Sequence, residues 1–194
     1  WTISCTTCPS WLSVSHTAGA STATLSGTPL NANVGDNSVV ISVADAASAT
    51  GTQSFTIVVA NTNDAPTISS TAVTAATEDT AYTYTVTTAD DDSDDITLTG
   101  TTVPSWLTFT ASTGVLAGTP LNANVGDNSV VITASDGNGG SVTDTFTITV
   151  ANTNDAPTIT STAVTAATED TAYTYTVTAA DVDSSDTITL TGTT

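Results

Sequence analysis

Hydrophobic and polar residues alternate along several short stretches of the chain. In residues 82–86, Tyr82, Tyr84 and Val86 occupy alternate positions, and threonines lie between them. Residues 145–150 repeat the pattern, with Phe, Ile and Val alternating with Thr. Because successive side chains of a strand point to opposite faces of its sheet, both stretches are predicted to be strands with one buried face.

Further strands are predicted between these two, separated by turn-rich segments such as ASTG, NANVGDN and SDGNGG. They cover residues 96–99, 106–110, 114–117 and 129–134, with a first strand near Thr67 or Thr158. About seven short strands in some 90 residues are typical of a Greek-key β-sandwich. The fold class is therefore predicted to be all-β, as tandem seven-stranded Greek-key β-sandwiches.

Long stretches of the sequence recur 91 residues later. NTNDAPTI fills residues 61–68 and 152–159, and TAVTAATEDTAYTYTVT begins at Thr71 and again at Thr162. A period of this length predicts one domain per repeat, joined by short linkers that contain proline. The expected domains are a partial repeat without its first strands (residues 1–62), a complete repeat (63–153) and the first strands of a third (154–194).

The ends of the sequence align with the middle repeat. TISCTTCPSWL at the start resembles TLTGTTVPSWL from Thr97, and the chain closes on TLTGTT. Two interpretations remain open. The sequence is a window on a longer array, or the trailing strands of one chain complete the open sandwich of the next and build a head-to-tail filament.

The net charge of the chain excludes some classes of binding partner. The chain has no Lys or Arg and 19 acidic residues, which give a formal charge of −19. Nucleic acid and anionic membranes would be repelled, so neither is expected as a partner. No apolar run is long enough to span a bilayer, so membrane insertion is not expected. Because hard cations bind oxygen ligands and would relieve the self-repulsion, calcium is the expected cofactor.

Several segments together carry a family resemblance. EDTAYTYTV, PSWLTF, GTP, VGDNSVVITASDGNGG and FTITVANTNDAP follow one another in this order. The set resembles the bacterial cadherin-like tandem repeats of large surface adhesins, of the dystroglycan-type cadherin and putative-immunoglobulin classes. The resemblance implies an extracellular location, at the cell surface or secreted, and partners that are neighbouring repeats, identical subunits arranged head-to-tail, or a host or cell-surface glycan or protein.

Loops of consecutive repeats are predicted to meet at each linker, since strands of a sandwich run alternately up and down. The candidate calcium ligands are the oxygen-bearing side chains of these loops and linkers. They are Asn61, Asn63, Asp64, Asp90, Asp92 and Asp136 at the first linker, and Glu78, Asp79, Asn152, Asn154, Asp155, Asp181 and Asp183 at the second.

The resemblance supports part of this set. Asn63 and Asp64 match the cadherin linker motif, and Glu78 and Glu169 resemble its early glutamate. Asp181 and Asp183 resemble the Asp-x-Asp pair, and Asp136 resembles the late aspartate. Asn61 stands where cadherins have aspartate, and one linker residue is missing before Ala65, so fewer ions per junction are expected. The alternative is that these carboxylates are solvated loop charges.

Other reactive residues give weaker signals. Cys5 and Cys8 form a C-x-x-C pair, for which a disulfide within the chain or between subunits is favoured over a zinc half-site or two thiols. His16 is the sole histidine and no serine nucleophile is placed beside it, so no enzymatic activity is expected. Trp11 and Trp106 recur in PSWL and are interpreted as core anchors rather than sugar platforms.

The sequence thus predicts a non-enzymatic extracellular module: a calcium-stiffened repeat array that serves as an adhesin stalk or a filament subunit. The alternative is an adhesive module that binds a carbohydrate or a protein. Burial of Trp106 would favour the structural role, and its exposure would favour sugar binding.

Overall fold

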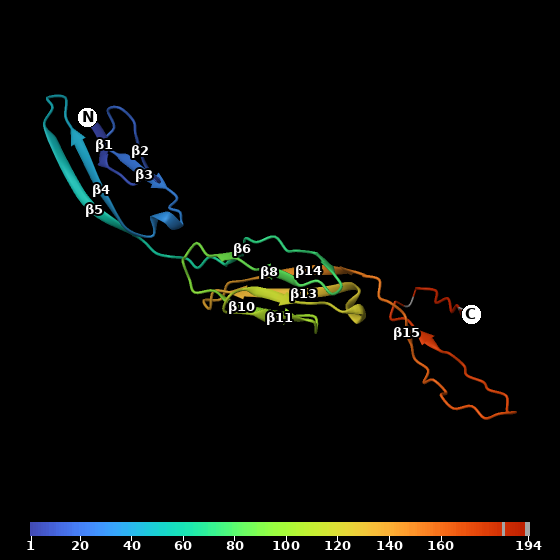
Figure 1. Cartoon of the computed structure of the whole chain (residues 1–194). Helices are drawn as coiled ribbons and strands as arrows, with labels where there is room; N and C mark the ends of the chain where they lie inside the picture. Colours follow the sequence, from blue (N-terminus) through green and yellow to red (C-terminus); the bar gives the residue numbers. More distant parts are fainter. Residues whose placement is uncertain (184, 193–194) are drawn as a thin grey trace. The chain divides into compact units, whose positions relative to one another are not determined.

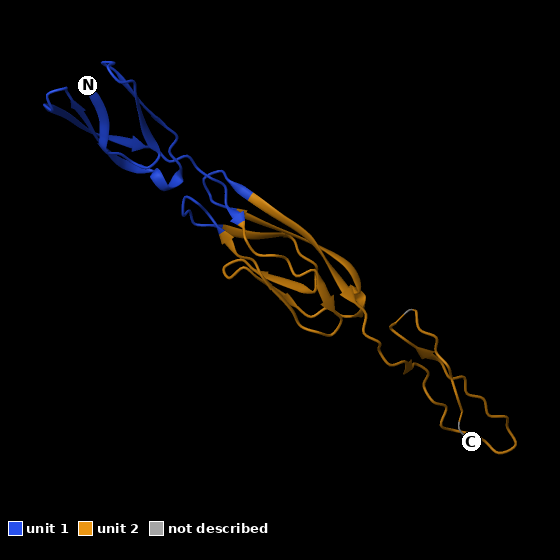
Figure 2. Ribbon diagram, turned by 90° about the horizontal axis from the view of Figure 1, so that it is seen from above, with its two compact units in different colours: residues 1–67, 89–96, 135–141 blue, residues 68–88, 97–134, 142–194 orange. Residues whose placement is uncertain are grey.

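The computed structural model describes residues 1–183 and 185–192 and is built almost entirely from strands. Its strands are labelled in Figure 1, and its two compact units are coloured in Figure 2. One unit contains residues 1–67, 89–96 and 135–141, and the other contains residues 68–88, 97–134 and 142–194. Among the described residues, no helix has the length and hydropathy needed to cross a membrane.

The first unit contains five strands and a short 3₁₀ turn. Strand β4 lies between β1 and β5 in an antiparallel sheet, while β2 and β3 form a separate hairpin. The register of β4 and β5 runs without interruption from Gly35 opposite Val59 to Ala44 opposite Thr50. The elements are β1 (Thr2–Thr7), β2 (Leu12–His16), β3 (Ala23–Gly27), η1 (Asn31–Asn33), β4 (Gly35–Ala44) and β5 (Thr50–Val59).

The middle repeat forms a complete sandwich. One sheet has the order β10-β13-β14-β7, and the other has the order β11-β12-β8. The two-residue strands β6 and β9 pair with each other. The elements are β6 (Thr67–Ile68), β7 (Ala75–Thr77), β8 (Tyr82–Thr85), β9 (Thr88–Ala89), β10 (Thr97–Thr102), β11 (Leu107–Thr110), β12 (Val115–Gly118), η2 (Asn122–Asn124), β13 (Gly126–Ser135) and β14 (Ser141–Ala151). The seven strands of the two larger sheets confirm the predicted fold class.

The core lies between these two sheets. The alternation seen in the sequence decides which side chains fill it, since every second residue of β8, β13 and β14 points inward. The buried cluster consists of Tyr82, Tyr84, Val86, Leu107, Leu116, Val130, Ile132, Ile148 and Val150. Trp106 is half-buried, packs edge-on against Tyr82 with ring centroids 5.8 Å apart, and donates a hydrogen bond from Nε1 to Asn128 Oδ1.

One feature of the motif GTP follows from backbone packing. A Cβ on Gly118 would overlap the carbonyl oxygen of Trp106, and a Cβ on Gly27 would overlap that of Trp11. Both glycines sit at the end of a strand that runs against the PSWL turn. Glycine is therefore required at both positions, because any side chain would force two backbones apart.

The last segment differs from the expected strands of a third repeat. It contains only two-residue strands, β15 (Thr158–Ile159) and β16 (Ala179–Ala180), which pair with each other. Residues 160–178 contain no strand, although they include a sequence identical to that of β7 and β8. The physical reason is that a strand needs a hydrogen-bonded neighbour. β7 and β8 pair with β14 and β12, and no corresponding strands pair with residues 160–178 in the described chain.

Candidate metal centre

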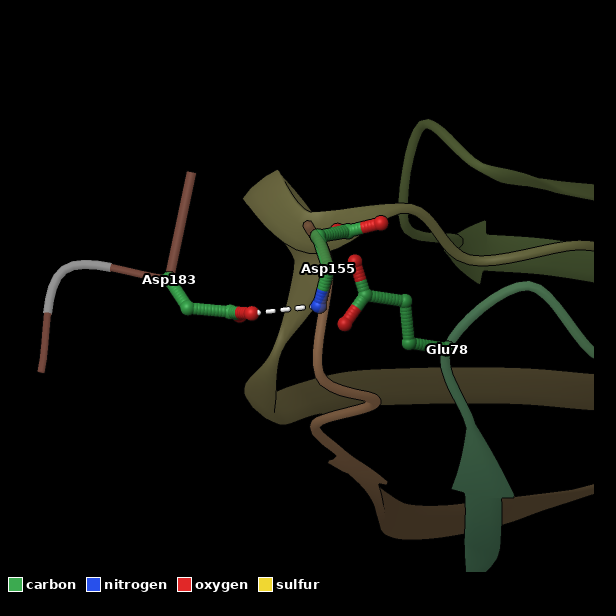
Figure 3. Close-up of side chains that lie close together, drawn as sticks. All are labelled: Glu78, Asp155 and Asp183. Atoms are coloured by element: carbon green, nitrogen blue, oxygen red, sulfur yellow. Dashed lines mark hydrogen bonds between the residues drawn. The ribbon is translucent and has the colours of Figure 1, made fainter. Parts of the chain in front are cut away.

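Three carboxylates from distant parts of the sequence converge beside the second linker. Ligand oxygens of Glu78, Asp155 and Asp183 all lie within 4.8 Å of one another. Glu78 follows β7, Asp155 belongs to the linker after β14, and Asp183 follows β16 (Figure 3). The Glu78 and Asp155 carboxylates lie side by side, and Asp183 approaches the backbone of Asp155. The grouping brings together the predicted early glutamate, the linker aspartate and the second aspartate of the Asp-x-Asp pair.

Glu78 is fixed in place by the linker. Its side chain is 2 % exposed, and its Oε2 accepts a hydrogen bond of 3.1 Å from the backbone N–H of Thr153. The hydroxyl of Thr153 donates to the Glu78 carbonyl oxygen at 3.2 Å. A carboxylate this deeply buried is stable only if its charge is compensated, and the chain has no Lys or Arg to do so.

Asp183 receives several hydrogen bonds. The backbone N–H of Asp155 donates to Oδ2 at 2.6 Å, and the side-chain amides of Asn152 and Asn122 donate to Oδ1 at 2.8 and 3.0 Å. These donors, led by the Asp155 N–H, lower the pKa of Asp183 below its ordinary value, although partial desolvation acts in the opposite direction. Asp183 therefore stays ionised and keeps a negative charge beside Glu78.

Asp183 also belongs to a second carboxylate cluster, formed with Asp181 and Asp186. The two clusters share Asp183 and together bring five acidic side chains to one end of the linker. Hard oxygen ligands in this number are what calcium requires, since it takes six to eight oxygens from carboxylates, carbonyls and waters. The donor set therefore fits calcium better than a softer metal.

A corresponding arrangement occurs at the first linker. The backbone N–H of Asp64 donates to Asp92 Oδ2 at 2.6 Å, the same bond as that between Asp155 and Asp183. Oxygens of Asp90, Asp92 and Asp94 lie within 4.8 Å of one another. Within the described residues, Asp90 Oδ2 and Asp92 Oδ1 are buried and have no hydrogen-bond partner. Buried carboxylate oxygens without a donor are destabilising, which is the situation that a bound cation would relieve.

Asp136 lies close to this cluster but is held by other groups. Asn63 Nδ2 donates to Oδ2 at 2.8 Å, and the backbone N–H groups of Asn138 and Gly140 donate to Oδ1 at 2.7 and 2.9 Å. The Asn63 amide is the main cause of a lowered pKa at Asp136, and the backbone N–H groups add to it while desolvation opposes it. Asn138 also donates to Asp94 Oδ2 at 2.8 Å, which ties the loop of Asp136 to the Asp90 cluster.

The lowered pKa of Asp136 predicts a pH-dependent contribution to stability. Its folded pKa lies below the ordinary value of 3.8, so the unfolded chain takes up the proton first as the pH falls. The stabilisation is complete above that ordinary value and is lost as the pH drops through the folded pKa. In thermal unfolding with chelator present, we expect the advantage of the natural chain over Asp136→Asn to be constant near neutral pH and to shrink below about pH 4.

Asp91→Asn is the matched control for this pH experiment, because Asp91 is exposed and lies outside the carboxylate clusters of the described chain. It measures the effect of removing one negative charge from an exposed position, which is subtracted from the effect of Asp136→Asn. If the natural chain remained more stable than Asp136→Asn by the same amount down to pH 3, the lowered pKa of Asp136 would be contradicted.

Some predicted ligands lie outside these clusters, and some contributors were not predicted. Asn61, Asp79 and Asn154 are exposed; within the described residues Asp79 belongs to none of the three carboxylate clusters, and Asn154 donates to the carbonyl of Asp155. Asp94 and Asp186 belong to the carboxylate clusters, and Asn122 donates a hydrogen bond to Asp183. Asn122 lies in the repeated NANVGDN segment, whose polar composition by itself predicts only a turn.

Cys5 and Cys8 are joined by a disulfide, with their Cα atoms 5.8 Å apart. This separation is ordinary for a disulfide. The bond closes the turn after β1, immediately before the PSWL segment.

Two sheets that enclose one core, antiparallel except where β7 runs parallel to β14, together with acidic loops at the linker define a domain of the cadherin-like and immunoglobulin-like class. A family model described as "Putative Ig domain" matches residues 1–60 and 65–151. The chain belongs to this family. No curated protein matches the chain.

The chain is similar to several solved structures. The extracellular domain of protocadherin GammaB4 is 15% identical, with a TM-score of 0.51 over 93% of this chain and 34% of that one. The human desmocollin-1 ectodomain is 14% identical, with a TM-score of 0.43 over 81% and 35%. An endo-fucoidan hydrolase of glycoside hydrolase family 107 is 30% identical, with a TM-score of 0.41 over 78% of this chain. The chain spans 23% of the length of that hydrolase.

Proposed function

We propose that this protein is a non-enzymatic, extracellular structural module in which calcium bound at each linker restrains consecutive repeats, as in the stalk of an adhesin or the body of a filament. The repeats are residues 1–62, 63–153 and 154–194. The observation that carries the proposal is the convergence of Glu78, Asp155 and Asp183, which come from two repeats and the linker between them.

The electrostatics support a role for a cation. The chain carries a formal charge of −19 and no Lys or Arg, so no side-chain cation other than His16 can neutralise the buried Glu78. Hydrogen-bond donors compensate part of the charge at Asp183. In the described structure, the Glu78 carboxylate accepts one hydrogen bond, from the N–H of Thr153. A divalent ion would hold Glu78, Asp155 and Asp183 and turn mutual repulsion into attraction.

The extracellular location is supported by the disulfide. Cys5 and Cys8 form a disulfide that persists in oxidising surroundings and is rare in the cytosol. Calcium is also abundant outside cells, where sites with dissociation constants of about 10⁻⁴ to 10⁻³ M are occupied. A weak site with few ligands is sufficient under these conditions.

Calcium titration tests the proposal. We expect calcium to raise the unfolding temperature and chelator to lower it, with about 1.4 kcal/mol gained per site at a free concentration tenfold above the Kd. Glu78→Gln should weaken calcium binding measured by calorimetry, because it removes the most buried carboxylate. Small-angle scattering should show larger motion between repeats after chelation.

Asp91→Asn is again the control, since it changes the net charge equally but alters no clustered oxygen. It should bind calcium as the natural chain does. Equal unfolding temperatures and scattering profiles with calcium and with chelator would reject the proposal.

A further inference from the structure

The loop between β13 and β14 contains the only asparagine that is followed by glycine in the sequence. Asn138 and Gly139 lie in the segment SDGNGG, and both residues are exposed. The backbone nitrogen after an asparagine can attack the side-chain amide carbon, and glycine hinders this approach least because it has no Cβ. The pair is therefore a candidate site of covalent modification.

The same turn forms in the first repeat without this pair. There the Asp45 carboxylate accepts hydrogen bonds of 2.9 and 2.8 Å from the backbone N–H groups two and four residues later. Asp136 accepts the corresponding bonds one repeat later, at 2.7 and 2.9 Å. Ala47 occupies the position of Asn138, so the turn itself does not require an amide side chain.

The Asn138 side chain instead reaches a carboxylate of another loop. Its Nδ2 donates a hydrogen bond of 2.8 Å to Asp94 Oδ2. Nδ2 is the atom that departs when the amide carbon is attacked, and it becomes positively charged as it takes up a proton. A carboxylate at this distance stabilises the developing positive charge.

The surroundings of Gly139 leave its nitrogen room to move. Gly139 has a φ of 111°, and no atom lies within 4 Å of a Cβ placed on it. Rotation of the backbone at this glycine brings the nitrogen towards Asn138 Cγ without a steric clash. The attacking atom and the stabilising carboxylate therefore lie on the two sides of the same amide group.

We propose that Asn138 is a site of spontaneous deamidation, at which Asp94 assists the departure of the side-chain nitrogen. The Gly139 nitrogen gives its proton to solvent and forms a bond to Asn138 Cγ. The bond between Cγ and Nδ2 breaks, and Nδ2 leaves as ammonia after taking a proton from water. Water then opens the cyclic succinimide to an aspartyl or an isoaspartyl residue. The net reaction consumes water, releases ammonia and needs no oxidant or reductant.

The aspartyl product changes the charge at the first linker. It places a carboxylate where Nδ2 now donates, so two acceptors face each other at residue 138 and Asp94. Without a cation, the hydrogen bond is lost and the two charges repel. With a cation, the new carboxylate offers a further oxygen beside Asp90, Asp92 and Asp94. This consequence rests on the proposed calcium role, whereas the deamidation itself does not.

The isoaspartyl product acts on the turn, because it lengthens the main chain between residues 138 and 139 by a carbon atom. The N–H of Gly140 donates to both carboxylate oxygens of Asp136, at 2.9 and 3.0 Å. A longer main chain displaces this donor. Asp136 also accepts a hydrogen bond from Asn63, so the linker loses part of its attachment to the turn.

Incubation of the natural chain at mildly alkaline pH tests the modification site. The chain has no Lys or Arg for trypsin, so it is digested with pepsin and the peptides are identified by mass spectrometry. Deamidation at Asn138 should be about tenfold faster than at Asn61 and Asn154, because glycine hinders the attack least. Both comparison residues are exposed asparagines, followed by Thr62 and Asp155. Equal rates at the three asparagines, or no reaction at Asn138, overturn the proposal.

Asp94→Asn tests the assistance by the carboxylate. A neutral amide does not stabilise the charge on the departing nitrogen, so deamidation of Asn138 should slow about threefold or more. Asp91→Asn is the matched control, because it removes an equal charge from an exposed position outside the carboxylate clusters of the described chain. It should leave the rate unchanged, and circular dichroism verifies that both variants are folded. Equal rates in these two variants contradict the role of Asp94.

The effect on the calcium site is measured with Asn138→Asp, which reproduces the aspartyl product. In chelator, its unfolding temperature should lie below that of Asn138→Gln, which keeps an amide and adds no charge. Calcium should raise the unfolding temperature of Asn138→Asp by the larger amount. An equal rise in the two variants counts against the calcium role and leaves the modification site standing. An Asn138 that stays intact in the natural chain counts against the modification alone.

Discussion

Replacing Leu116 with alanine is expected to destabilise the middle repeat by about 3 kcal/mol. Leu116 has no exposed surface and lies in β12, between β11 and β8, at the centre of the buried cluster. Removing three carbons there leaves a cavity that the surrounding strands cannot fill, because both sheets are fixed by their hydrogen bonds. Amide hydrogen exchange resolved by residue should show the loss of protection across β12, β13 and β14.

Leu25→Ala provides the matched comparison in the first repeat. Leu25 occupies the same repeat position but is partly exposed, so the same change should cost only about 1 kcal/mol. Equal costs for Leu116→Ala and Leu25→Ala in monomeric protein would show that the first repeat has a closed core and would contradict the comparison of burial.

The change Gly118→Ala is expected to destabilise the protein by about 3 kcal/mol or more, although it adds a single methyl group. The new Cβ would overlap the carbonyl oxygen of Trp106 and would lie 3.0 Å from its carbonyl carbon. Neither atom can move without separating β11 from β12, whose register joins Leu107 to Gly118. Denaturant unfolding followed by circular dichroism measures the effect.

Gly51→Ala is the control, since Gly51 lies in β5 and a Cβ there would meet only Val43 Cγ1 at an ordinary 3.5 Å. That change should be neutral within about 0.5 kcal/mol, or slightly stabilising. Gly27→Ala should behave like Gly118→Ala, because Gly27 has the same close approach to Trp11. A small effect at Gly118 would mean that the PSWL turn shifts easily, and the explanation for the recurring GTP motif would fail.

The alternation of residue types was sufficient to predict most strands of the middle repeat, but not β7 or the two-residue β9. Residues 82–86 and 145–150 fall on β8 and β14, and the stretches between them fall on β10 to β13 with boundaries shifted by a few residues. This succeeds because side-chain parity along a strand is a local property that burial of one face imposes on the sequence. The fold class followed from the number and spacing of these strands.

The candidate metal centre was predictable only in part. The alternating direction of the strands predicts that Glu78 lies at the linker after β14 and Asp92 at the linker before β6. Hydrogen bonds from Thr153 to Glu78 and from Asp64 to Asp92 place them there. It could not decide which oxygens of each loop point inward. Asp79 adopts a left-handed backbone and turns its side chain outward, while its neighbour Glu78 is buried. Asn122 reaches Asp183 across 61 residues, a contact that no local pattern indicates.

The sequence by itself determined the repeat, the parity of the strands, the turns and the concentration of acidic residues at the linkers, because each of these depends on neighbouring residues or on direct repetition. Only the tertiary structure decided which identical residues become strands. Residues 75–77 and 82–85 are β7 and β8, while the same letters at 166–168 and 173–176 form no strand. The reason is that a strand is completed by hydrogen bonds from another segment, and β14 and β12 provide them only in the middle repeat.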